Sequence, residues 1–526
     1  MNAPLPGGSI RPTDLCDLAF ENTFVRDLPA DPDTRNIPRQ VRNISYTRVD
    51  PTPVAAPRLL AWSDATGELL GVARPASPDG PAAQVLAGSR VLPGMQPYAA
   101  RYGGHQFGHW AGQLGDGRAI TLGETIAPDG SRQELQLKGA GRTPYSRTAD
   151  GRAVLRSSLR EFMCSEAMHH LGVPTTRALS LAATGESVIR DMFYDGNAAP
   201  EQGAVVCRVA PSFVRFGNFQ ILTAQGEDDL LKRLADYVIR EHYPGIGSYD
   251  AWFREICRRS ALLMADWMRL GFVHGVMNTD NLSILGVTID YGPYGWLEGY
   301  DLSWTPNTTD AEGRRYCYGN QPHIAQWNLT RLAEALMPLV PEKEALQEGL
   351  ALYADTFNTA WTRALAQKLG LSALDQPGDD ELASDMFELM QAVETDFTLF
   401  FRSLAAVDAD APDMAPLAHA FYADDAPRER WNAWLARYAA RTKLDGTSAT
   451  TRVTRMNAAN PRYVFRNYLA QQAIDALEKG DVSVLERLMQ VLQHPYDEHP
   501  AHEELAARRP EWARHKAGCS ALSCSS

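Results

Sequence analysis

The sequence has little cysteine, and its few cysteines are not paired. Only seven of the 526 residues are Cys, and no two of them form a Cys-x-x-Cys motif. They are scattered along the chain at Cys16, Cys164, Cys207, Cys257, Cys317, Cys519 and Cys524. This distribution argues against a disulfide scaffold and against a zinc-ribbon site. It predicts a cytoplasmic protein with mostly free thiols.

Long apolar runs are also missing. No stretch reaches the length that a transmembrane helix needs, so we expect no membrane association. The first thirty residues contain Asp14, Asp17, Glu21 and Asp27. An acidic start of this kind fits neither a secretory signal nor an Arg-rich transit peptide.

Basic charge is in deficit, and there is no internal repeat. The formal net charge is -13 at pH 7, which argues against a general nucleic-acid-binding protein. Local groups of Arg and Lys are therefore informative, because they stand out from an acidic background. At 526 residues the chain is long enough for a large core and more than one lobe.

The order of the expected elements predicts an α+β protein with two lobes. Strand-like pieces run to about residue 150, and "ELQLKGAG" alternates as a strand does before a Gly turn. A helix is expected after Asp150 and Gly151, because Leu155, Leu159 and later apolar residues recur every four positions. Residues 249–272 predict a second amphipathic helix.

From about residue 325 the pattern becomes helical. Helical segments are expected near 325–369, 381–406, 427–441 and 461–492, with irregular stretches at 407–426 and 442–460. We divide the chain into an extended lead-in packing on the small lobe (1–90), a β-rich small lobe (91–205), a helical large lobe (206–500) and a tail (501–526).

Four stretches could together hold a nucleotide, and the first is rich in glycine. "GQLGDGRAITLGE" places Gly115, Gly117 and Arg118 in one turn. Glycines allow a backbone turn to approach a phosphate closely, and its N–H groups can donate to the phosphate oxygens. A plain Gly-rich turn remains an alternative, because the spacing matches neither a Walker loop nor a strict Gly-x-Gly-x-x-Gly motif.

The second stretch combines Lys138, at the end of an expected strand, with Glu161 on the helix that follows. Kinase-fold enzymes hold nucleotide phosphates with such a Lys and fix it with a Glu from the next helix. The alternative is that both are solvated surface charges.

The third stretch is a group of arginines. Clustered guanidinium groups in an acidic protein indicate a polyanionic ligand, because each can grip phosphate in bidentate fashion. The group consists of Arg142, Arg147, Arg152, Arg156, Arg160, Arg208 and Arg215. Several are expected on a helix surface, whereas Arg208 and Arg215 lie in an apolar stretch and need another explanation.

The fourth stretch is "HGVMNTDNLSILGVTIDYGPYG". It follows the kinase pattern His-Arg-Asp-Leu-x-x-x-Asn and then Asp-Phe-Gly, with His274, Asn281 and Asp290 in the matching places. The residues between Asn281 and Asp290 predict a tight hairpin that brings the two together. An amide oxygen and a carboxylate are hard ligands that suit Mg²⁺ carried by a nucleotide.

One position departs from the kinase pattern. Val276 stands where a kinase has the Asp that accepts the proton of the substrate hydroxyl. The nearest carboxylate is Asp280. Either catalysis has been lost, or the reacting phosphorus and its nucleophile lie elsewhere in the site.

With these residues in view, the sequence closely resembles the selenoprotein O family. The likeness covers roughly residues 90–320 and returns at "MNAANPRYVFRNYLAQQAI". It rests on long phrases such as "YGGHQFGHWAGQLGDGR" and "FVHGVMNTDNLSILGVTIDYGP". The resemblance implies a protein-kinase-like bilobal fold with extra C-terminal helices. It also implies transfer of AMP from ATP to Ser, Thr or Tyr hydroxyls of proteins, with release of pyrophosphate.

The resemblance also implies roles for individual residues. Asp280 matches the proposed proton acceptor, while Asn281 and Asp290 match metal ligands for Mg²⁺ or Mn²⁺, and Glu161 matches the ion-pair partner of Lys138. The matching nucleotide contacts are Gly115, Gly117, Arg118, Lys138, Asp150, Gly151, Arg208, Arg215 and Asp290.

The family's account gives Val276 a reason. ATP is expected to lie reversed relative to a kinase, with the γ-phosphate held by Arg208 and Arg215 and the α-phosphate facing the incoming hydroxyl. A base placed for attack at the γ-phosphorus would then have no role. The arginines would stabilise the pyrophosphate leaving group.

The chain ends in "CSALSCSS". Family members carry selenocysteine or cysteine near this end, and the resemblance implies redox control through a disulfide. Cys524 matches that position, and Cys519 and Cys317 are possible partners, because the aligned stretch "LSWTPNTTD" holds no Cys. A tail with free thiols remains the alternative.

Three functions therefore stay open. The first is protein AMP transfer, with UMP transfer from UTP possible and self-modification possible. The second is a kinase-fold phosphotransferase that moves the γ-phosphate, favoured by the layout from His274 to Gly292 and opposed by Val276. The third is a non-catalytic nucleotide-binding pseudokinase.

Overall fold

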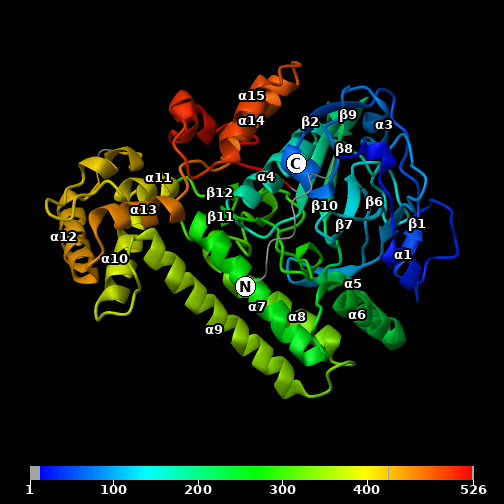
Figure 1. The fold of residues 1–526 in the computed structure, drawn as a ribbon, viewed down its shortest axis with the longest axis horizontal. Coiled ribbons are helices and arrows are strands. Elements are labelled where there is room, and N and C mark those ends of the chain that lie inside the picture. Colours follow the sequence, from blue (N-terminus) through cyan, green and yellow to red (C-terminus); the bar gives the residue numbers. More distant parts are fainter. Residues whose placement is uncertain (1–11, 424–425, 524–526) are drawn as a thin grey trace.

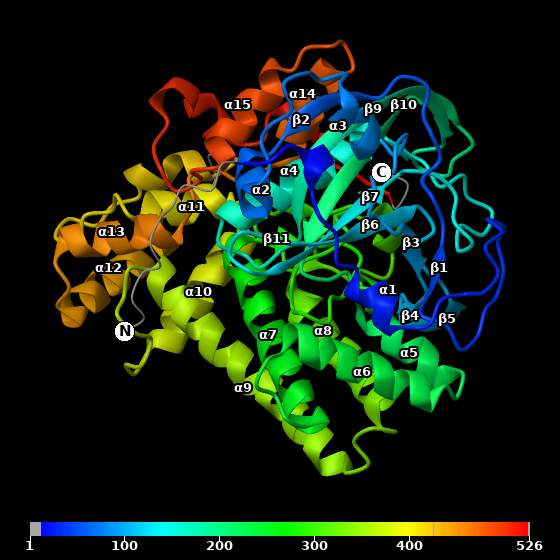
Figure 2. The ribbon, with the colours of Figure 1, turned by 45° about the vertical axis from the view of Figure 1, so that its right-hand side comes forward.

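The structure, a computed structural model, describes residues 12–423 and 426–523. Strands dominate the first part of the chain and helices the second (Figure 1). The sheet and the long helices α7 (Tyr249–Leu270) and α9 (Lys343–Lys368) form neighbouring bodies, with α7 and α9 running side by side (Figures 1 and 2). This arrangement confirms the α+β, two-lobed fold expected from the sequence.

The first lobe is built on one eight-stranded antiparallel sheet, in the order β1-β3-β6-β7-β10-β9-β2 with β8 paired to β10. Its strands are β1 (Tyr46–Arg48), β2 (Arg58–Trp62), β3 (Tyr98–Ala100), β6 (Ala119–Ile126), β7 (Arg132–Lys138), β8 (Ala153–Val154), β9 (Arg177–Arg190) and β10 (Ala199–Ala210). The strand predicted from "ELQLKGAG" is β7, and it is confirmed.

Both faces of this sheet are buried. On one face Leu181 and Val206 join the same apolar cluster as Leu159 of helix α4 (Leu155–His170). On the other face Leu137 clusters with Leu86, from the short helix α3 (Pro81–Leu86). Residues before 90 therefore cover the outer face and also supply β1, β2, α1 (Thr23–Asp27) and α2 (Asp64–Leu70).

Helix α4 lies where the fourfold apolar spacing predicts it. Figure 2 shows it between the sheet and the helices α14 (Asn467–Leu477) and α15 (Ser483–Leu492). The helix is almost wholly buried, because strands cover one side of it and C-terminal helices the other. Polar side chains on α4 therefore need internal partners.

Helix α7 carries the chain into the candidate catalytic loop. Ser248 caps its N-terminus by accepting a hydrogen bond from the backbone N–H of Ala251, and Gly271 ends it with a φ of +69°. A left-handed residue at this place is the usual way to stop a helix, and glycine adopts it without strain. The helix predicted at 249–272 is confirmed.

The second lobe is helical, as expected. Besides α7 and α9 it contains α5 (Phe216–Ala224), α6 (Asp228–His242), α8 (Gln321–Leu336), α10 (Asp379–Ala392), α11 (Phe397–Leu404), α12 (Arg428–Asp445), α13 (Ala449–Ala459), α14 and α15. Two kinds of sequence prediction are wrong here. Residues 325–369, 381–406 and 461–492 each form two helices rather than one, and the stretch 442–460 is not irregular, because it holds α13.

The missed helix α13 has a physical reason. Its only fully buried apolar residue is Met456, so the segment has no apolar stripe to reveal it. Buried Arg452 instead donates to the carbonyl of Val407, and Ser448 caps the N-terminus by accepting from Thr451 N–H. Tertiary hydrogen bonds rather than amphipathic pattern hold the helix in place.

Strand β10 crosses the residue 205 boundary that we predicted between the lobes, since it continues to Ala210. The tail after 500 contains short 3-10 turns, Pro500–Ala506 and Glu511–Arg514. Leu522 then pairs with Asn307 in an isolated parallel bridge. The division of the chain into four segments remains a prediction.

No helix among residues 12–423 and 426–523 combines the length and the apolar composition that a membrane crossing requires.

Candidate active site

A cleft of about 950 Å³ contains the predicted site residues from both lobes. Its lining includes all eleven residues assigned to nucleotide, metal or proton transfer: Gly115, Gly117, Arg118, Lys138, Asp150, Gly151, Arg208, Arg215, Asp280, Asn281 and Asp290. Segments that lie far apart in the sequence thus meet in one place. Glu161, the remaining predicted residue, reaches the cleft through its ion pair with Lys138.

The Lys138–Glu161 pair links the sheet to helix α4. Lys138 ends β7, and its Nζ lies 2.6 Å from Glu161 Oε2. The Glu161 side chain is only 2% exposed. Burial lowers the pKa of Lys138, and the neighbouring Glu161 and Asp290 carboxylates work against that shift. The alternative of two solvated surface charges is therefore wrong.

Asp290 is surrounded by cations. Its carboxylate forms ion pairs with Arg208 and Arg215, and Lys138 Nζ lies 3.6 Å from Oδ1. Burial alone would raise its pKa, but Arg215 and Arg208 hold the pKa of this carboxyl well below its usual value. The residue has a φ of +57°, a left-handed conformation that is uncommon outside glycine and concentrates at functional sites.

Arg208 and Arg215 are held from several sides. Arg208, on β10, donates to Glu161 Oε1 at 3.0 Å and to the side-chain oxygen of Gln136. Arg215, directly before α5, donates to the backbone carbonyl of Asp280 at 2.7 Å. Both guanidinium groups are almost fully buried. Their positions are therefore fixed before any ligand arrives.

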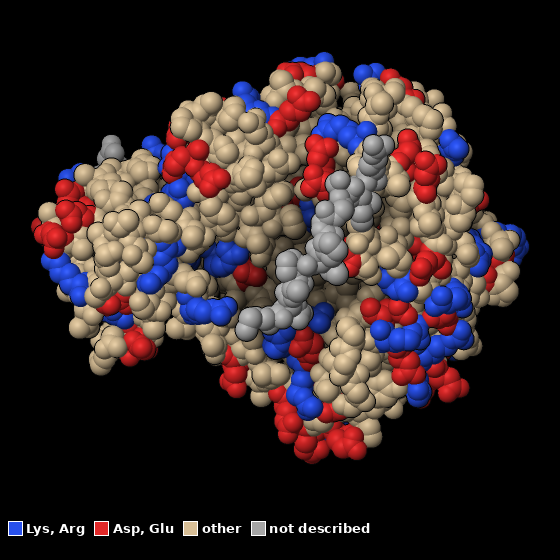
Figure 3. All heavy atoms as spheres, in the orientation of Figure 1, with Lys and Arg blue, Asp and Glu red and all other residues tan. Residues whose placement is uncertain are grey.

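The cations of the cleft lie among several buried carboxyl groups. Lys138, Arg208 and Arg215 form ion pairs with Glu161 and Asp290, and the buried Asp116 and Asp280 line the same cleft. On the face shown in Figure 3, acidic and basic side chains of the described residues are interspersed. The buried guanidinium groups of Arg208 and Arg215 can donate to the oxygens of a polyanion such as a triphosphate.

The loop from His274 to Asn281 joins α7 to the cleft. His274 is fully buried, its ring stacks on Trp267 at 5.3 Å, and its Nε2 is bonded to the Ile289 carbonyl. Its role is structural. Asn281 Nδ2 donates to the Val276 carbonyl at 3.0 Å, which leaves the amide oxygen available for another partner.

The predicted turn between Asn281 and Asp290 is confirmed in a reduced form. Leu282 and Thr288 make a single antiparallel bridge rather than a regular two-stranded hairpin. The bridge is enough to bring both ends of the segment to the same cleft.

Asp280 lies beneath the hairpin of β4 (Gly103–Gln106) and β5 (His109–Gln113). Its Oδ2 accepts a hydrogen bond from Gln106 Nε2 at 3.2 Å, whereas its buried Oδ1 has no hydrogen-bond partner among the described residues. Burial raises the pKa of Asp280 to about 6. An unsatisfied carboxylate oxygen of raised basicity can accept a proton.

The glycines of the 112–118 turn pack against a neighbouring loop. A Cβ on Gly115 would lie 2.5 Å from Tyr145 Cγ, and one on Gly117 would lie 3.1 Å from the Tyr145 carbonyl oxygen. The absence of side chains thus allows two loops to approach each other at the mouth of the cleft. Arg118 forms no ion pair with any residue that the structure describes.

Asp150 and Gly151 form another part of the rim. Asp150 is paired with Arg190, whose NH1 lies 2.7 Å from Oδ2. Gly151 has a φ of +73°, and a Cβ there would lie 2.2 Å from the backbone of Gly141. The rim is therefore closed by a backbone-to-backbone contact that only glycine permits.

Some residues of the cleft were not predicted from the sequence. Gln136 accepts from Arg208, and the ring of Tyr102 lies 4.6 Å from the Arg215 guanidinium carbon. Gly104 and Gln106 contact Asp280. None of these belongs to a short motif. Three of the four, Tyr102, Gly104 and Gln106, lie in the phrase "YGGHQFGHWAGQLGDGR". The Gly-Gly pair in that phrase was the sequence signal for a close approach of the backbone to another part of the site.

Cys317 and Cys519 are free thiols in the structure. Burial raises the pKa of Cys519 to about 11, which makes its thiolate scarce at neutral pH. Cys524, the third predicted redox residue, lies outside the described residues. The predicted redox switch remains untested.

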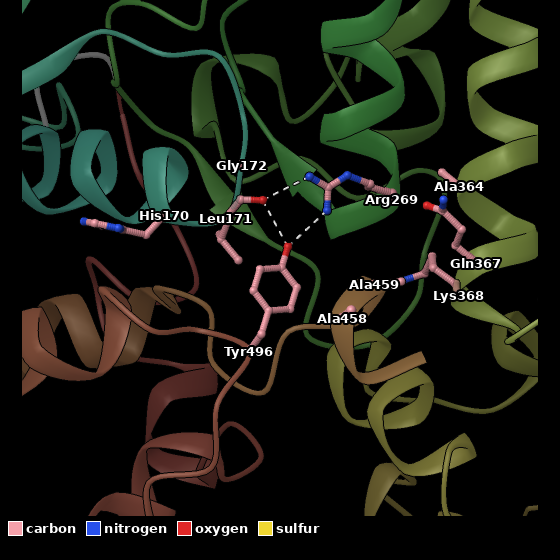
Figure 4. A pocket seen from close by; sticks show the side chains of 10 residues that line it. All are labelled: His170, Leu171, Gly172, Arg269, Ala364, Gln367, Lys368, Ala458, Ala459 and Tyr496. Carbon is pink, nitrogen blue, oxygen red and sulfur yellow. Dashed lines mark hydrogen bonds between the residues drawn. The ribbon is translucent and has the colours of Figure 1, made fainter. Parts of the chain in front are cut away.

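A second cavity, of about 320 Å³, lies between the ends of α4, α7, α9 and α13 (Figure 4). Its polar groups bind one another: Arg269 and Tyr496 both donate to the Leu171 carbonyl, and Lys368 Nζ donates to Asn460 at 2.9 Å. These hydrogen bonds join helices, and they occupy the polar groups that a ligand would otherwise bind. The larger cleft is therefore the better candidate for an active site.

Comparison with known proteins gives a family. The profile of the family described as protein adenylyltransferase SelO matches residues 36–493. The chain is 64% identical to protein nucleotidyltransferase YdiU of Nitrosospira multiformis, over 98% of this chain and 97% of that protein. It is 60% identical to protein nucleotidyltransferase YdiU of Azoarcus sp., over 97% of this chain and 99% of that one.

Among solved structures the likeness is weaker. WaaP in complex with acyl carrier protein matches 46% of this chain and 84% of its own, at 15% identity and a TM-score of 0.18. ROP2 from Toxoplasma gondii, a virulence factor with a protein-kinase fold and no enzymatic activity, matches 56% and 83%, at 11% identity and a TM-score of 0.23. The sequence relatives are the stronger finding: the chain belongs to the SelO family of protein adenylyltransferases.

Proposed function

We propose that this protein transfers AMP from ATP to Ser, Thr or Tyr hydroxyls of other proteins and releases pyrophosphate. The observation that carries the proposal is the buried cluster of Arg208, Arg215 and Lys138 at one end of the cleft, with Val276 where a kinase would need its base. Family membership supports the same reaction.

The cluster supports a reversed nucleotide. Arg208 and Arg215 are the most deeply buried cations of the cleft, so the most highly charged end of ATP belongs there. The α-phosphorus then lies toward Asp280, and the two arginines stabilise the charge that develops on pyrophosphate. The remaining contacts would come from Gly115, Gly117, Arg118, Lys138, Asp150 and Gly151, with Glu161 holding Lys138.

The donor set fits a hard divalent cation. No group of three His, Cys, Asp or Glu in the described part of the chain could hold a metal alone, but Asp290 and Asn281 offer a carboxylate and an amide oxygen in the same cleft. Mg²⁺ commonly takes few protein ligands and completes its shell with phosphate oxygens and water. Bound there, Mg²⁺ or Mn²⁺ would neutralise phosphate charge.

In the proposed reaction, Asp280 accepts the proton of the acceptor hydroxyl. The acceptor hydroxyl oxygen forms a bond to the α-phosphorus, the bond from that phosphorus to the pyrophosphate oxygen breaks, and the hydroxyl proton passes to Asp280. Asp280 is the only carboxylate of the loop that lines the cleft and has an unsatisfied oxygen. Val276 cannot take the proton.

Two labels test the reaction. ATP labelled at the α-phosphate should mark protein, and ATP labelled at the γ-phosphate should not, because only AMP is retained. Intact mass after incubation with ATP and metal should show the gain of one AMP. Transfer of the γ-label would instead establish a phosphotransferase, and no label from either position would indicate a nucleotide-binding protein without activity. Labelled UTP in the same assay measures UMP transfer.

Gly104 offers a test of the base that removes none of the proposed functional groups. A Cβ there would lie 2.6 Å from Asp280 Oδ1, so Gly104→Ala must displace the carboxylate. We expect AMP transfer to fall about tenfold to a hundredfold, as for a catalytic group misplaced by about 1 Å. Gly247→Ala is the matched control, because nothing lies within 4 Å of its added Cβ. If the two variants transferred AMP equally fast, Asp280 would not be the proton acceptor.

The broader assignments are proposals as well. We infer a cytoplasmic location from the scattered cysteines, protein rather than nucleic-acid acceptors from the net charge of -13, and possible self-modification. Redox control through Cys524, with Cys519 or Cys317 as partner, remains a hypothesis.

A further inference from the structure

The β4–β5 hairpin is inserted between β3 and β6 and rests on the loop that carries Asp280 (Figure 2). His105 N–H donates to Thr279 Oγ1 at 2.7 Å, and Gln106 Nε2 donates to Asp280 Oδ2 at 3.2 Å. Gln106 and Phe107 line the cleft beside Asp280. An acceptor hydroxyl bound at Asp280 therefore lies close to this hairpin.

The outer side of the hairpin presents an aromatic surface. Trp110 is a large apolar side chain that is 40% exposed. The ring of His105 lies 5.1 Å from Trp110 and 5.5 Å from Trp327 of helix α8. The hairpin and α8 thus form one continuous surface.

Two arginines complete that surface. The guanidinium of Arg315 lies 4.6 Å from the Trp327 ring, and that of Arg331 lies 5.1 Å from the same ring. Arg331 is paired with Glu334 at 2.7 Å, but Arg315 forms no ion pair with any carboxylate among residues 12–423 and 426–523. We call Trp110, Arg315, Trp327 and Arg331 the Trp–Arg platform.

The platform adjoins the end of the cleft that holds Asp280. The rings of Phe107 and Tyr316 lie 5.2 Å apart, and a Cβ on Gly108 would lie 3.3 Å from the Arg315 guanidinium carbon. Phe107 thus belongs to both the cleft and the contacts around Arg315. A polypeptide segment whose hydroxyl enters the cleft would lay its neighbouring residues on the platform.

The chemistry of the platform selects a class of segment. Arg315 Nε is buried, so its terminal N–H groups are the donors left for a carboxylate, and an exposed tryptophan is a frequent anchor in protein interfaces. We propose that the Trp–Arg platform docks the acceptor protein through Asp or Glu side chains close to the modified hydroxyl. The inference rests on the proposed AMP transfer and adds a substrate class to it.

Matched peptides test the inference. Peptides with one central Ser, Thr or Tyr, flanked by Asp and Glu or by Asn and Gln, are compared as AMP acceptors of the full-length protein. We expect kcat/KM to be at least about tenfold higher for the acidic peptides, as a charged hydrogen bond provides. Arg315→Glu should abolish that preference by raising the KM for the acidic peptides. The kcat on the neutral peptides should stay unchanged.

Two further variants separate docking from folding and from bulk charge. Trp110→Ala removes an exposed side chain and should raise KM for both peptide sets. Arg430→Glu makes the same charge change on an exposed face of α12 and should leave the preference intact. Equal use of acidic and neutral peptides by the wild type, or an unchanged preference in Arg315→Glu, would overturn the inference while leaving AMP transfer in place. No transfer of AMP to any peptide or to the protein itself would overturn the proposed function and the inference with it.

Discussion

Asp290→Asn is expected to lower AMP transfer about a thousandfold, because a metal-ion ligand supports several kcal/mol of transition-state charge stabilisation. The substitution keeps the size of the side chain and removes only its charge. Initial rates with α-labelled ATP at saturating Mg²⁺ measure the loss. If the variant transferred AMP at a rate within threefold of the wild type, Asp290 would be excluded as a metal ligand, because each tenfold in rate corresponds to about 1.4 kcal/mol.

The same variant should be destabilised, and ATP should restore its stability. Without Asp290, Lys138 and Arg208 keep Glu161 as their ion-pair partner, and Arg215 keeps no ion pair among the described residues. Removing one partner of a buried ion pair costs about 3–5 kcal/mol. Metal-free ATP brings negative charge back to the cluster, so with EDTA present it should raise the Tm of the variant more than that of the wild type.

Asp379→Asn is the matched control for stability. Asp379 is buried and paired with Arg441, whose Nε lies 2.7 Å from Oδ1, but it belongs to helix α10 and does not line the cleft. Its variant should also lose stability, and ATP should raise its Tm only as much as it raises that of the wild type. Equal rescue of both variants would mean that the cationic cluster does not receive the triphosphate.

Asp280→Asn is expected to lower kcat by about 10²–10⁴-fold, the usual contribution of a general base. Asparagine keeps an oxygen that can accept the hydrogen bond from Gln106, so the β4–β5 hairpin should stay in place. ATP affinity should change little, because Asp280 is placed at the hydroxyl side of the reaction. The measurement pairs AMP transfer with the ATP-induced rise in Tm.

The two readouts of Asp280→Asn distinguish a base from a binding residue. A drop in transfer with an unchanged ATP effect supports the base. A parallel loss of both would assign Asp280 to nucleotide or metal binding instead. Full activity with normal ATP binding would place proton acceptance on another group.

The pair Lys138 and Glu161 illustrates what pattern can predict. The strand alternation before Lys138 and the fourfold apolar spacing around Glu161 are local features, and each is confirmed as β7 and α4. Pattern could not establish that the two side chains meet. That needed the antiparallel pairing of β7 with β10 and the packing of α4 on the sheet, which are long-range contacts.

Helix α13 and the β4–β5 hairpin illustrate the opposite case. Neither has a strong apolar period of its own, and both are held by polar contacts to distant residues, such as Arg452 to Val407 and His105 to Thr279. A single sequence contains no periodic signal for contacts of this kind. The Trp–Arg platform gives no periodic signal for the same reason.

The sequence by itself determined the α+β class, the helices that precede the catalytic loop and carry Glu161, and the identity of the residues that gather in the cleft. The class and the helices follow from hydrophobic period and turn residues, which are local properties of the chain, and the cleft residues follow from motif spacing together with the resemblance to the selenoprotein O family. Only the tertiary structure decided that Asp290 binds both arginines, that Asp280 keeps one oxygen unsatisfied beneath Gly104, and that the Arg315 guanidinium forms no ion pair with the described residues. Charge balance and burial depend on which distant side chains come together, and packing rather than local pattern settles that.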